Sequence, residues 1–598
     1  MGLVSSAVGA ARPAGQPRSG LRIRACWLIL GGYLLAAVAL TWRLWADPAS
    51  RMQTGDITDV NLFAWFIRYA AVSVAHGSLP SLVNTAMNAP QGINLMWNTS
   101  LLLPGVLLTP VTLLAGPQTS LTVLLTLGFA GSAAALFWVL LRWGASIGAA
   151  ALGGAVYGFS PALLASSIGH YHLQFAVLPP LMIDALLRIV TGRGHPLRSG
   201  AWLGLLVAAQ LFTGEELVVD TALAGLVMLA VLAASAPREV RARAVSTVAG
   251  LAVAAGVTLL IAGYGLWVQF HGPLAEHGGP WTPNRYRNRA AAFVTPSGDL
   301  WLHTHADAVA IASHPLERPE YVAYLGWPLL IVLLVAAVRY WRSWLVRIPA
   351  VTCAVLELLS LGGTQVVRGV TVPRQLLPWH WLAHLPILDQ VLPDRLSILA
   401  DGMAAAVLAF ALDRALAGAG ATTSRPGPAS RWRRAVPAAI AALAVLPLIP
   451  LPIHTTQVAP VPAGWQTVFA RLQLARNAPV LVVPTASGQA PQALRWYAET
   501  GQPGSMSGGY FIGPDHTGRG RMYGGRQAKA AATSINAMWL DPVHGQRLSS
   551  AQFRGYLARW RPAAVVAVTR RTSRLGRLLS AVLGRPGFAA GRVLGWRR

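Results

Sequence analysis

The sequence contains little of what a soluble or disulfide-stabilised protein needs. Only 12% of its 598 residues are charged, whereas soluble domains carry about 25%. Its two cysteines, Cys26 and Cys353, both lie within apolar segments. They allow neither a disulfide framework nor a zinc site built from cysteines, and their number does not indicate a redox compartment.

Lysine and acidic residues are also scarce. Lys529 is the only lysine, and 48 Lys+Arg against 21 Asp+Glu give a net charge of +27 that is carried almost entirely by arginine. These arginines lie in loops between apolar segments rather than on one soluble face, which argues against nucleic acid as a partner. Orientation in the membrane and contact with membrane lipids explain them better. No His-Glu-x-x-His motif and no P-loop is present.

Long apolar segments are abundant. The chain is 54% hydrophobic with a mean hydropathy of +0.49, which predicts an α-helical polytopic membrane protein with about 11 transmembrane helices. Residues 1–24 are expected to form a cytoplasmic tail and 25–452 the membrane domain. Arg22 and Arg24 precede the first span, so the positive-inside rule places the N-terminus in the cytoplasm. We expect a multi-pass protein of a bacterial plasma membrane.

The loops of this membrane domain have a predicted side. Residues 46–120, 267–320 and 363–395 are expected to form outer loops. Within the first loop, Leu101–Ala115 is apolar but short and contains prolines, so it is expected to lie at the membrane interface without spanning. With that assignment, the short loops rich in arginine all fall on the inner side.

The character of the chain changes after residue 452. Residues 453–598 are predicted to form a small extracytoplasmic α/β domain, since Pro479–Pro484 and Ala563–Val568 are typical of buried strands. A helix is expected around Phe553–Trp560. The glycine-rich run Gly501–Gly525 matches no phosphate-binding spacing and is predicted to be a flexible surface loop.

Two carboxylates open the first outer loop and are the main candidates for chemistry. Asp56 and Asp59 are three residues apart at the start of a predicted helix, so they share one helix face. A carboxylate there could take a proton from an acceptor hydroxyl beside a lipid-linked substrate. The same pattern also suits a purely structural role, with Asp56 as the N-cap and Asp59 in the first turn. Local sequence alone leaves both interpretations open.

Other polar groups at the predicted outer ends of spans are candidate substrate-binding residues. Glu215 and Glu216 lie between two apolar runs, where ionisable groups are costly, although a water-exposed turn would also accommodate them. Arg395 begins a predicted span, and arginine suits the bidentate binding of phosphate. His170 and His172 are spaced two apart, which does not place them on one helix face, so hydrogen bonding or phosphate contact is favoured over a metal site. A divalent cation on Asp56, Asp59 or a glutamate remains open, and nothing in the sequence requires one.

This layout resembles the GT-C superfamily of membrane glycosyltransferases, and more closely the bacterial relatives of the protein O-mannosyltransferases. The resemblance rests on a first span with its start inside, an outer loop opened by an acidic pair, a proline-rich interfacial segment, and the pattern Leu121–Arg142 followed by Gly148–Pro161. It covers roughly residues 25–415. It implies inverting transfer of a sugar from a polyprenyl-phosphate donor to a lipid or glycan acceptor outside the membrane, in envelope glycan assembly. One acidic residue of the first outer loop would be the base, Asp56 before Asp59. The family often has adjacent acidic residues there, and this chain spaces them three apart.

Two other function classes remain as alternatives. A transporter or a lipid-linked glycan flippase would use the same carboxylates as a substrate or proton site, with internal two-fold symmetry and broken helices. A non-catalytic protein of envelope assembly would act through its outer domain. The acidic residues fall on the predicted outer side only, which favours the enzyme.

Overall fold

The computed structural model describes residues 19–598, except for 283–284, 313–317, 368, 422–427, 476 and 546–547. Residues 1–18 of the predicted cytoplasmic tail therefore lie outside the described residues. The chain forms two compact units. Unit 1 consists of Met1–Trp45, Val123–Ile261 and Thr282–His454, and unit 2 of Ala46–Thr122, Ala262–Trp281 and Thr455–Arg598.

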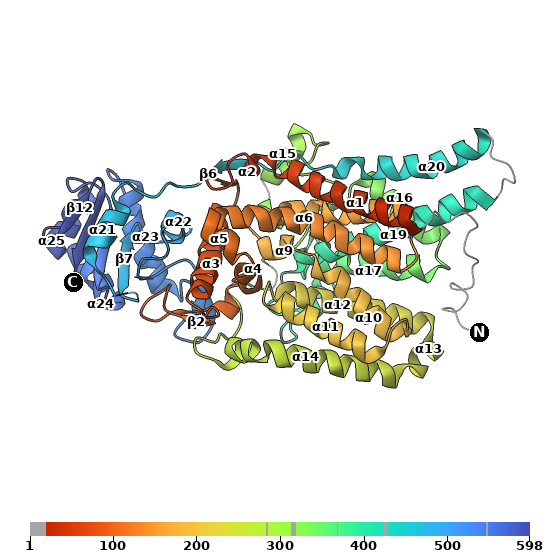
Figure 1. The fold of residues 1–598 in the computed structure, drawn as a ribbon, viewed down its shortest axis with the longest axis horizontal. Helices are drawn as coiled ribbons and strands as arrows, with labels where there is room; N and C mark the ends of the chain where they lie inside the picture. The colour runs from red at the N-terminus through yellow and green to blue at the C-terminus, as the bar shows by residue number, and fades with distance from the viewer. Residues whose placement is uncertain are drawn as a thin grey trace. The chain divides into compact units, whose positions relative to one another are not determined.

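Unit 1 is built mainly from helices, which Figure 1 labels along the chain. Their bounds are α1 Ser19–Leu40, α2 Trp42–Trp45, α6 Pro117–Arg142, α7 Ile147–Gly158, α8 Pro161–Ser166, α9 Tyr171–Gln174, α10 Leu178–Thr191, α11 Pro196–Leu211, α12 Glu216–Ser235, α13 Pro237–Ala242, α14 Ala244–His271, α15 His305–Ala312, α16 Trp327–Arg339, α17 Trp344–Ser360, α18 Trp379–Leu382, α19 Leu396–Ala421 and α20 Pro428–Val445. Helices α6 and α14 begin or end in unit 2. A short hairpin joins β4, Val366–Val367, to β5, Val370–Thr371.

Six helical stretches among the described residues are long and apolar enough to cross a membrane. They are Leu21–Leu40, Thr109–Arg142, Ile147–Ser166, Glu216–Ser235, Ala244–His271 and Pro393–Ala419. Trp327–Arg339 and Ala435–Leu448 are apolar but shorter. These helices agree with a multi-pass membrane protein, and the predicted number of about 11 spans stays a prediction.

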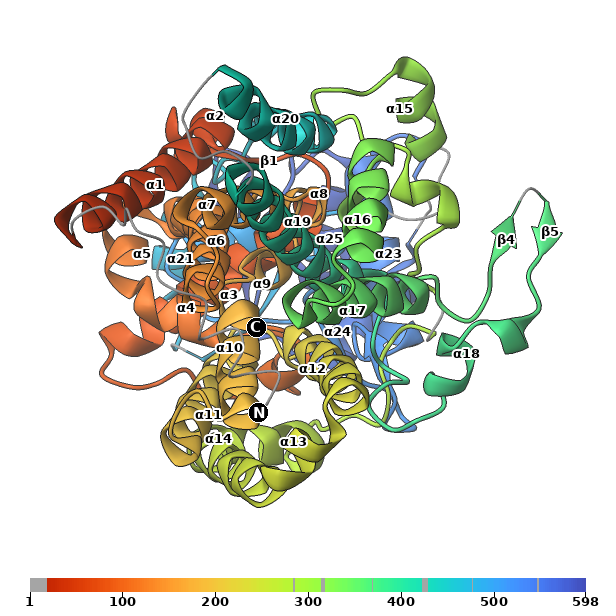
Figure 2. The same ribbon diagram turned by 90° about the vertical axis from the view of Figure 1, so that its right-hand side faces the viewer.

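Small residues allow the helices of unit 1 to approach one another closely. A Cβ added to Gly158 of α7 would lie 2.5 Å from the backbone nitrogen of Ala133 in α6. One added to Gly200 of α11 would lie 2.1 Å from the carbonyl oxygen of Gly250 in α14. Small residues at such crossings are typical of helices that pack within membranes. Figure 2 shows α17 and α19, which pack against each other, together with α7, which also packs on α19.

Unit 2 combines an α/β sheet with most of the segment predicted to be the first outer loop. Its sheet has the strand order β12-β13-β11-β7-β8, with β7 parallel to β11 and to β8. The strands are β7 Pro479–Val483, β8 Ser505–Met506, β11 Ala564–Val568, β12 Phe588–Ala590 and β13 Val593–Arg597, and the helices are α21 Trp465–Leu472, α22 Gln492–Glu499, α23 Arg526–Leu540, α24 Ser550–Trp560 and α25 Arg574–Leu583. The two predicted strands and the predicted helix near Phe553 are confirmed, because these stretches are the apolar runs that fill the core of this sheet.

The remaining elements of unit 2 belong mostly to residues 46–120, the predicted first outer loop. They are α3 Ile57–Ala75, α4 Leu102–Leu107, α5 Thr109–Ala115, β1 Arg51–Gln53, β2 Val83–Asn84, β3 Ile93–Asn94, β6 Thr455–Gln457, β9 Ile512–Pro514 and β10 Gly520–Met522. Strand β1 pairs with β6, β2 with β3, and β9 with β10. Helices α4 and α5 pack against α3 and are each too short to span a membrane.

The prediction that Gly501–Gly525 is a simple surface loop is wrong. Ser505 and Met506 form the edge strand β8 beside Pro479 and Val480, and both are buried. Several glycines of this run have positive φ, which lets the buried backbone turn sharply. The strand at Ser505–Met506 forms because it pairs with β7, which is distant in the sequence, and the composition of the segment alone cannot predict such pairing.

Candidate functional site

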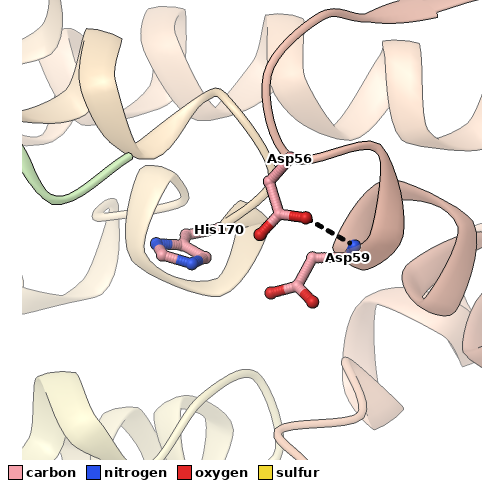
Figure 3. A group of neighbouring side chains, drawn as sticks. All are labelled: Asp56, Asp59 and His170. Carbon is pink, nitrogen blue, oxygen red and sulfur yellow. Dashed lines mark hydrogen bonds between the residues drawn. The ribbon is translucent and has the colours of Figure 1, made fainter. Parts of the chain in front are cut away.

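The acidic pair, Asp56 and Asp59, begins helix α3. The Oδ1 atom of Asp56 accepts hydrogen bonds from the backbone N–H groups of Thr58, at 3.1 Å, and Asp59, at 3.0 Å. Figure 3 draws the second of these bonds. Asp56 is thus the N-cap of α3 and Asp59 lies in its first turn. This is the structural role that the sequence pattern allowed, and it also fixes the position of the Asp56 carboxylate.

Both carboxylates of the acidic pair remain partly exposed, whereas most of the following helix is buried. Between them, the hydroxyl of Thr58 donates a hydrogen bond to the carbonyl oxygen of Gly488 at 3.4 Å. Gly488 in turn donates its N–H to the hydroxyl of Tyr523 at 2.9 Å. The start of α3 therefore lies against a polar loop of the α/β sheet region, all within unit 2. The pair has the accessibility that a group contacting a substrate needs.

A buried arginine anchors the first turns of α3. Arg495 on α22 is fully buried, and its Nε donates to Asn61 Oδ1 at 2.9 Å. Asn61 donates to the carbonyl oxygen of Ile57 at 2.8 Å, which ties the same side chain to the first residue of α3. Arg495 Nη2 also donates to Gln118 Oε1 at 2.8 Å, and its Nη1 lies 3.4 Å from Glu499. These contacts hold the helix start on a rigid support.

Unit 1 contains a second charged site, which we call the Arg395 cluster: Glu216, Glu320 and Arg395. Arg395, at the end of a 3-10 turn before α19, donates to both carboxylate oxygens of Glu320, at 2.8 and 3.3 Å. Its Nη1 also donates to Glu216, the first residue of α12. The side chains of Arg395 and Glu320 are 10% and 4% exposed. Arg395 is therefore already held by two carboxylates, with which a phosphate would have to compete.

The two histidines lie beside this cluster. His170 and His172 are buried, with ring centroids 5.8 Å apart, and His170 Nδ1 lies 3.8 Å from Glu320 Oε1. Burial, with help from His170 and Arg395, lowers the pKa of His172 well below its ordinary value. Burial would raise the pKa of Glu320, but Arg395 and His170 hold it below its ordinary value. These shifts favour a neutral His172 and an ionised Glu320.

Glu215 occupies the position before α12, without a side-chain capping bond, and is partly exposed. The structure thus brings Glu216, Arg395, His170 and His172 together in unit 1. Of these residues, His170 is also drawn in Figure 3. Asp56 and Asp59 lie together in unit 2.

Sequence reasoning missed three acidic residues around the Arg395 cluster: Asp220, Glu320 and Asp394. Asp220 and Asp394 are fully buried, and the Asp394 carboxyl lies in hydrogen-bond contact with Glu320. Asp220 follows Glu216 by four positions on α12, a spacing that could have suggested a shared helix face. Glu320 gave no local signal. Asp220 and Asp401 are also buried within helices that could span a membrane.

Comparisons with known proteins indicate the fold. No family model and no curated protein sequence matches the chain. Among solved structures, the oligosaccharyltransferase AglB from Archaeoglobus fulgidus, in complex with an inhibitory peptide and a dolichol-phosphate, superposes with a TM-score of 0.50 and 11% identity. That match covers 91% of this chain and 69% of AglB. The apo form of the A. fulgidus oligosaccharyltransferase gives 0.51 and 12% identity, covering 90% and 69%.

A second kind of enzyme is equally similar. The arabinofuranosyltransferase AftD from Mycobacteria superposes with a TM-score of 0.51 and 14% identity, over 96% of this chain. The match spans only 40% of the AftD chain. Sequence identities this low support a shared fold only. Since both are GT-C membrane glycosyltransferases, the resemblance noted in the sequence is confirmed at the level of architecture, and the chain has a GT-C-like fold.

Proposed function

We propose that this protein is a membrane glycosyltransferase that transfers a sugar from a polyprenyl-phosphate donor to an extracytoplasmic lipid or glycan acceptor in envelope glycan assembly. The observation that carries the proposal is a GT-C-like fold over at least 90% of the chain, combined with a partly exposed acidic pair at the start of α3. The dolichol-phosphate held by AglB supports a lipid phosphate as the kind of donor.

In the proposed reaction, an acceptor hydroxyl attacks the anomeric carbon of the donor sugar and inverts its configuration. The bond from that carbon to the phosphate oxygen breaks, and polyprenyl phosphate leaves. The hydroxyl proton passes to a carboxylate of the acidic pair, Asp56 before Asp59. Because phosphate is already a good leaving group, the protein has to supply mainly a positioned base and charge compensation. The capping bonds engage Asp56 Oδ1 and leave Oδ2 for this role.

We assign supporting roles to the residues of unit 1. Glu215, Glu216, His170 and His172 would contact substrate hydroxyl or phosphate groups. Arg395 is a positioning residue in this scheme, since its contacts with Glu216 and Glu320 fix the direction of both carboxylates. A direct contact of Arg395 with the donor phosphate would require Glu216 to move.

A divalent cation fits the acidic pair chemically. Two carboxylates one helical turn apart supply the hard oxygen ligands that Mg²⁺ and Mn²⁺ prefer, with water completing the shell. A cation there would compensate the charge that develops on the leaving phosphate. Asp56 and Asp59 would each contribute oxygens to it.

The orientation proposed from the arginine-rich loops places the N-terminus in the cytoplasm and residues 453–598 outside a bacterial plasma membrane. In this orientation the α/β region and the acidic pair, which share unit 2, meet acceptors outside the cell.

A transporter or flippase is the second candidate, and one observation favours it. Asp220 and Asp401 are buried in helices that could span the membrane, where ionisable residues often belong to proton or substrate paths. The two candidates differ in chemistry: only the glycosyltransferase breaks the bond between sugar and phosphate.

The test is to incubate the purified full chain in nanodiscs with a panel of polyprenyl-phosphate sugars and candidate glycan acceptors. The enzyme predicts release of polyprenyl phosphate together with a glycosylated acceptor. Movement of intact donor across a liposome membrane, with no cleavage of any donor in the panel, would favour the flippase.

A further inference from the structure

Unit 1 contains a cavity lined almost wholly by apolar side chains. It lies among α6, α10, α12, α17 and α19 and opens to the surface of unit 1. Its lining includes Leu187 of α10, Met228 of α12 and Phe410 of α19, besides Trp143 and Trp344. None of the residues in the Arg395 cluster lines it. An opening with such an apolar lining suits a hydrocarbon chain.

At one end of the lining, the guanidinium of Arg193 covers the indole rings of Trp143 and Trp344. The indoles of Trp143 and Trp344 meet edge to face, with centroids 5.6 Å apart. The guanidinium of Arg193 lies over both, 4.5 Å from the Trp143 ring and 5.6 Å from the Trp344 ring. Arg193 is exposed and forms no ion pair with the residues that the structure describes. Its charge is therefore available to an anion.

More arginines converge on the same loop. Arg142 and Arg188 lie 2.9 and 4.0 Å from the buried carboxylate of Asp184, which also accepts from Trp143 Nε1 at 2.9 Å. Arg243 reaches the loop as well, since a Cβ added to Gly192 would collide with its guanidinium. One carboxylate thus faces several guanidinium groups, and the loop keeps an excess of positive charge.

Two buried donors near this end also have no partner among the described residues. They are the Nε1 of Trp344, which lines the cavity, and the Oγ of the preceding Ser343. A buried donor without an acceptor is costly, so a ligand oxygen at this position would be favourable.

We propose that this arginine-capped cavity binds an anionic phospholipid, with an acyl chain in the cavity and the phosphodiester at Arg193. A free phosphate would leave the apolar space unfilled, and a neutral lipid would leave the arginines uncompensated. Basic pockets between membrane helices are known to bind anionic headgroups. This site goes beyond sugar transfer and does not depend on it.

The test is a competition measured by native mass spectrometry. The delipidated full chain is mixed with equal amounts of phosphatidylglycerol and phosphatidylcholine that have identical acyl chains. One arginine near a headgroup contributes about 1 kcal/mol, so the first bound lipid should be phosphatidylglycerol by a factor of about five. Glycerol phosphate, which lacks the chain, should not displace it.

Variants separate the two halves of the site. Arg193→Gln should abolish most of the preference, while the matched control Arg198→Gln, exposed in the first turn of α11 and without the aromatic contact, should keep it. Ala406→Phe fills the cavity and should remove the first bound lipid of either kind, and Met228→Phe provides a second filling variant if the first fails to fold. Equal binding of both lipids to the wild type would overturn the proposal. So would equal losses in Arg193→Gln and Arg198→Gln, or unchanged lipid binding in a folded filling variant.

Discussion

The acidic pair of unit 2 and the Arg395 cluster of unit 1 place carboxylates in opposite settings. Asp56 and Asp59 are partly exposed neighbours on one helix turn, and Asp56 accepts its capping bonds from the backbone N–H groups of Thr58 and Asp59. Glu216 and Glu320 are more than 100 residues apart in the chain and are held by one buried guanidinium. The first arrangement leaves carboxylate oxygens accessible to a substrate, and the second neutralises charge inside a packed helical region.

A third carboxylate shows what burial does without a guanidinium. Glu276 in unit 2 is buried, and neither of its oxygens has a hydrogen-bond partner among the described side chains and backbone groups. Burial raises its pKa to about 8, whereas the arginine holds the pKa of buried Glu320 below its ordinary value. The difference between the two glutamates is thus the partner and not the depth. This comparison of carboxylates with and without a guanidinium partner predicts which substitutions change stability and which change activity.

The largest effect on stability is expected from Arg395→Met. Removing one partner of a buried ion pair leaves uncompensated charge and typically costs about 3–5 kcal/mol. The thermal unfolding midpoint of the detergent-solubilised protein should fall strongly. Arg414→Met, an exposed position on the following helix α19, is the matched control and should change little. Equal midpoints for the two variants would show that the cluster is not a structural ion pair.

A comparable loss of stability is expected from Arg495→Met. Each hydrogen bond from a charged donor contributes about 1.5–3 kcal/mol, and the variant loses those to Asn61 and Gln118. Because these bonds support the first turn of α3, the variant should also lose sugar transfer. Arg526→Met, at the exposed start of α23, serves as control. Hydrogen exchange at the start of α3 that does not change in Arg495→Met would contradict the anchoring role.

Glu276→Gln should change the pH dependence of stability. The folded pKa of about 8 lies above the ordinary value of 4.5, so this glutamate stabilises the fold fully below pH 4.5 and loses that contribution as pH rises to 8. The wild type should therefore lose more stability than Glu276→Gln between pH 5 and pH 9. The measurement is the unfolding midpoint of both proteins across that range. Parallel curves would contradict the assignment.

The smallest effect on stability is expected from substitutions at Asp56, which separate its role as the N-cap of α3 from its proposed role as the base. Asparagine caps a helix about as well as aspartate, whereas alanine costs about 1 kcal/mol. Asp56→Ala should therefore be slightly less stable than Asp56→Asn, which should match the wild type. Helix stability can be followed by hydrogen exchange in the first turn of α3. Identical exchange in the two variants would mean that the capping bonds contribute nothing measurable.

Local patterns predicted the features that depend on neighbouring residues. The capping position of Asp56, the strand at Pro479–Val483 and the helix ending at Trp560 each follow from a few adjacent side chains. The GT-C-like layout followed from the order of apolar segments and charged loops.

Long-range pairing could not be predicted in the same way. The partnership of Arg395 with Glu320 joins residues 75 positions apart, and nothing near either residue indicates it. The same holds for Arg495, whose partner Asn61 lies 434 positions away, and for the edge strand formed by Ser505 and Met506. These features depend on tertiary packing, which overrides local propensity.

The central claim is that the acidic pair performs the chemistry, and the most direct measurement is the rate of sugar transfer by Asp56→Asn. This variant keeps the cap and removes the charge, so any loss cannot come from a frayed helix. A positioned base contributes typically 10²–10⁴-fold, and we expect the rate to fall by about that factor with unchanged thermal stability. Asp59→Asn, measured beside it, identifies the base if Asp59 takes that role. Transfer at the wild-type rate in both variants and in their combination would contradict the account.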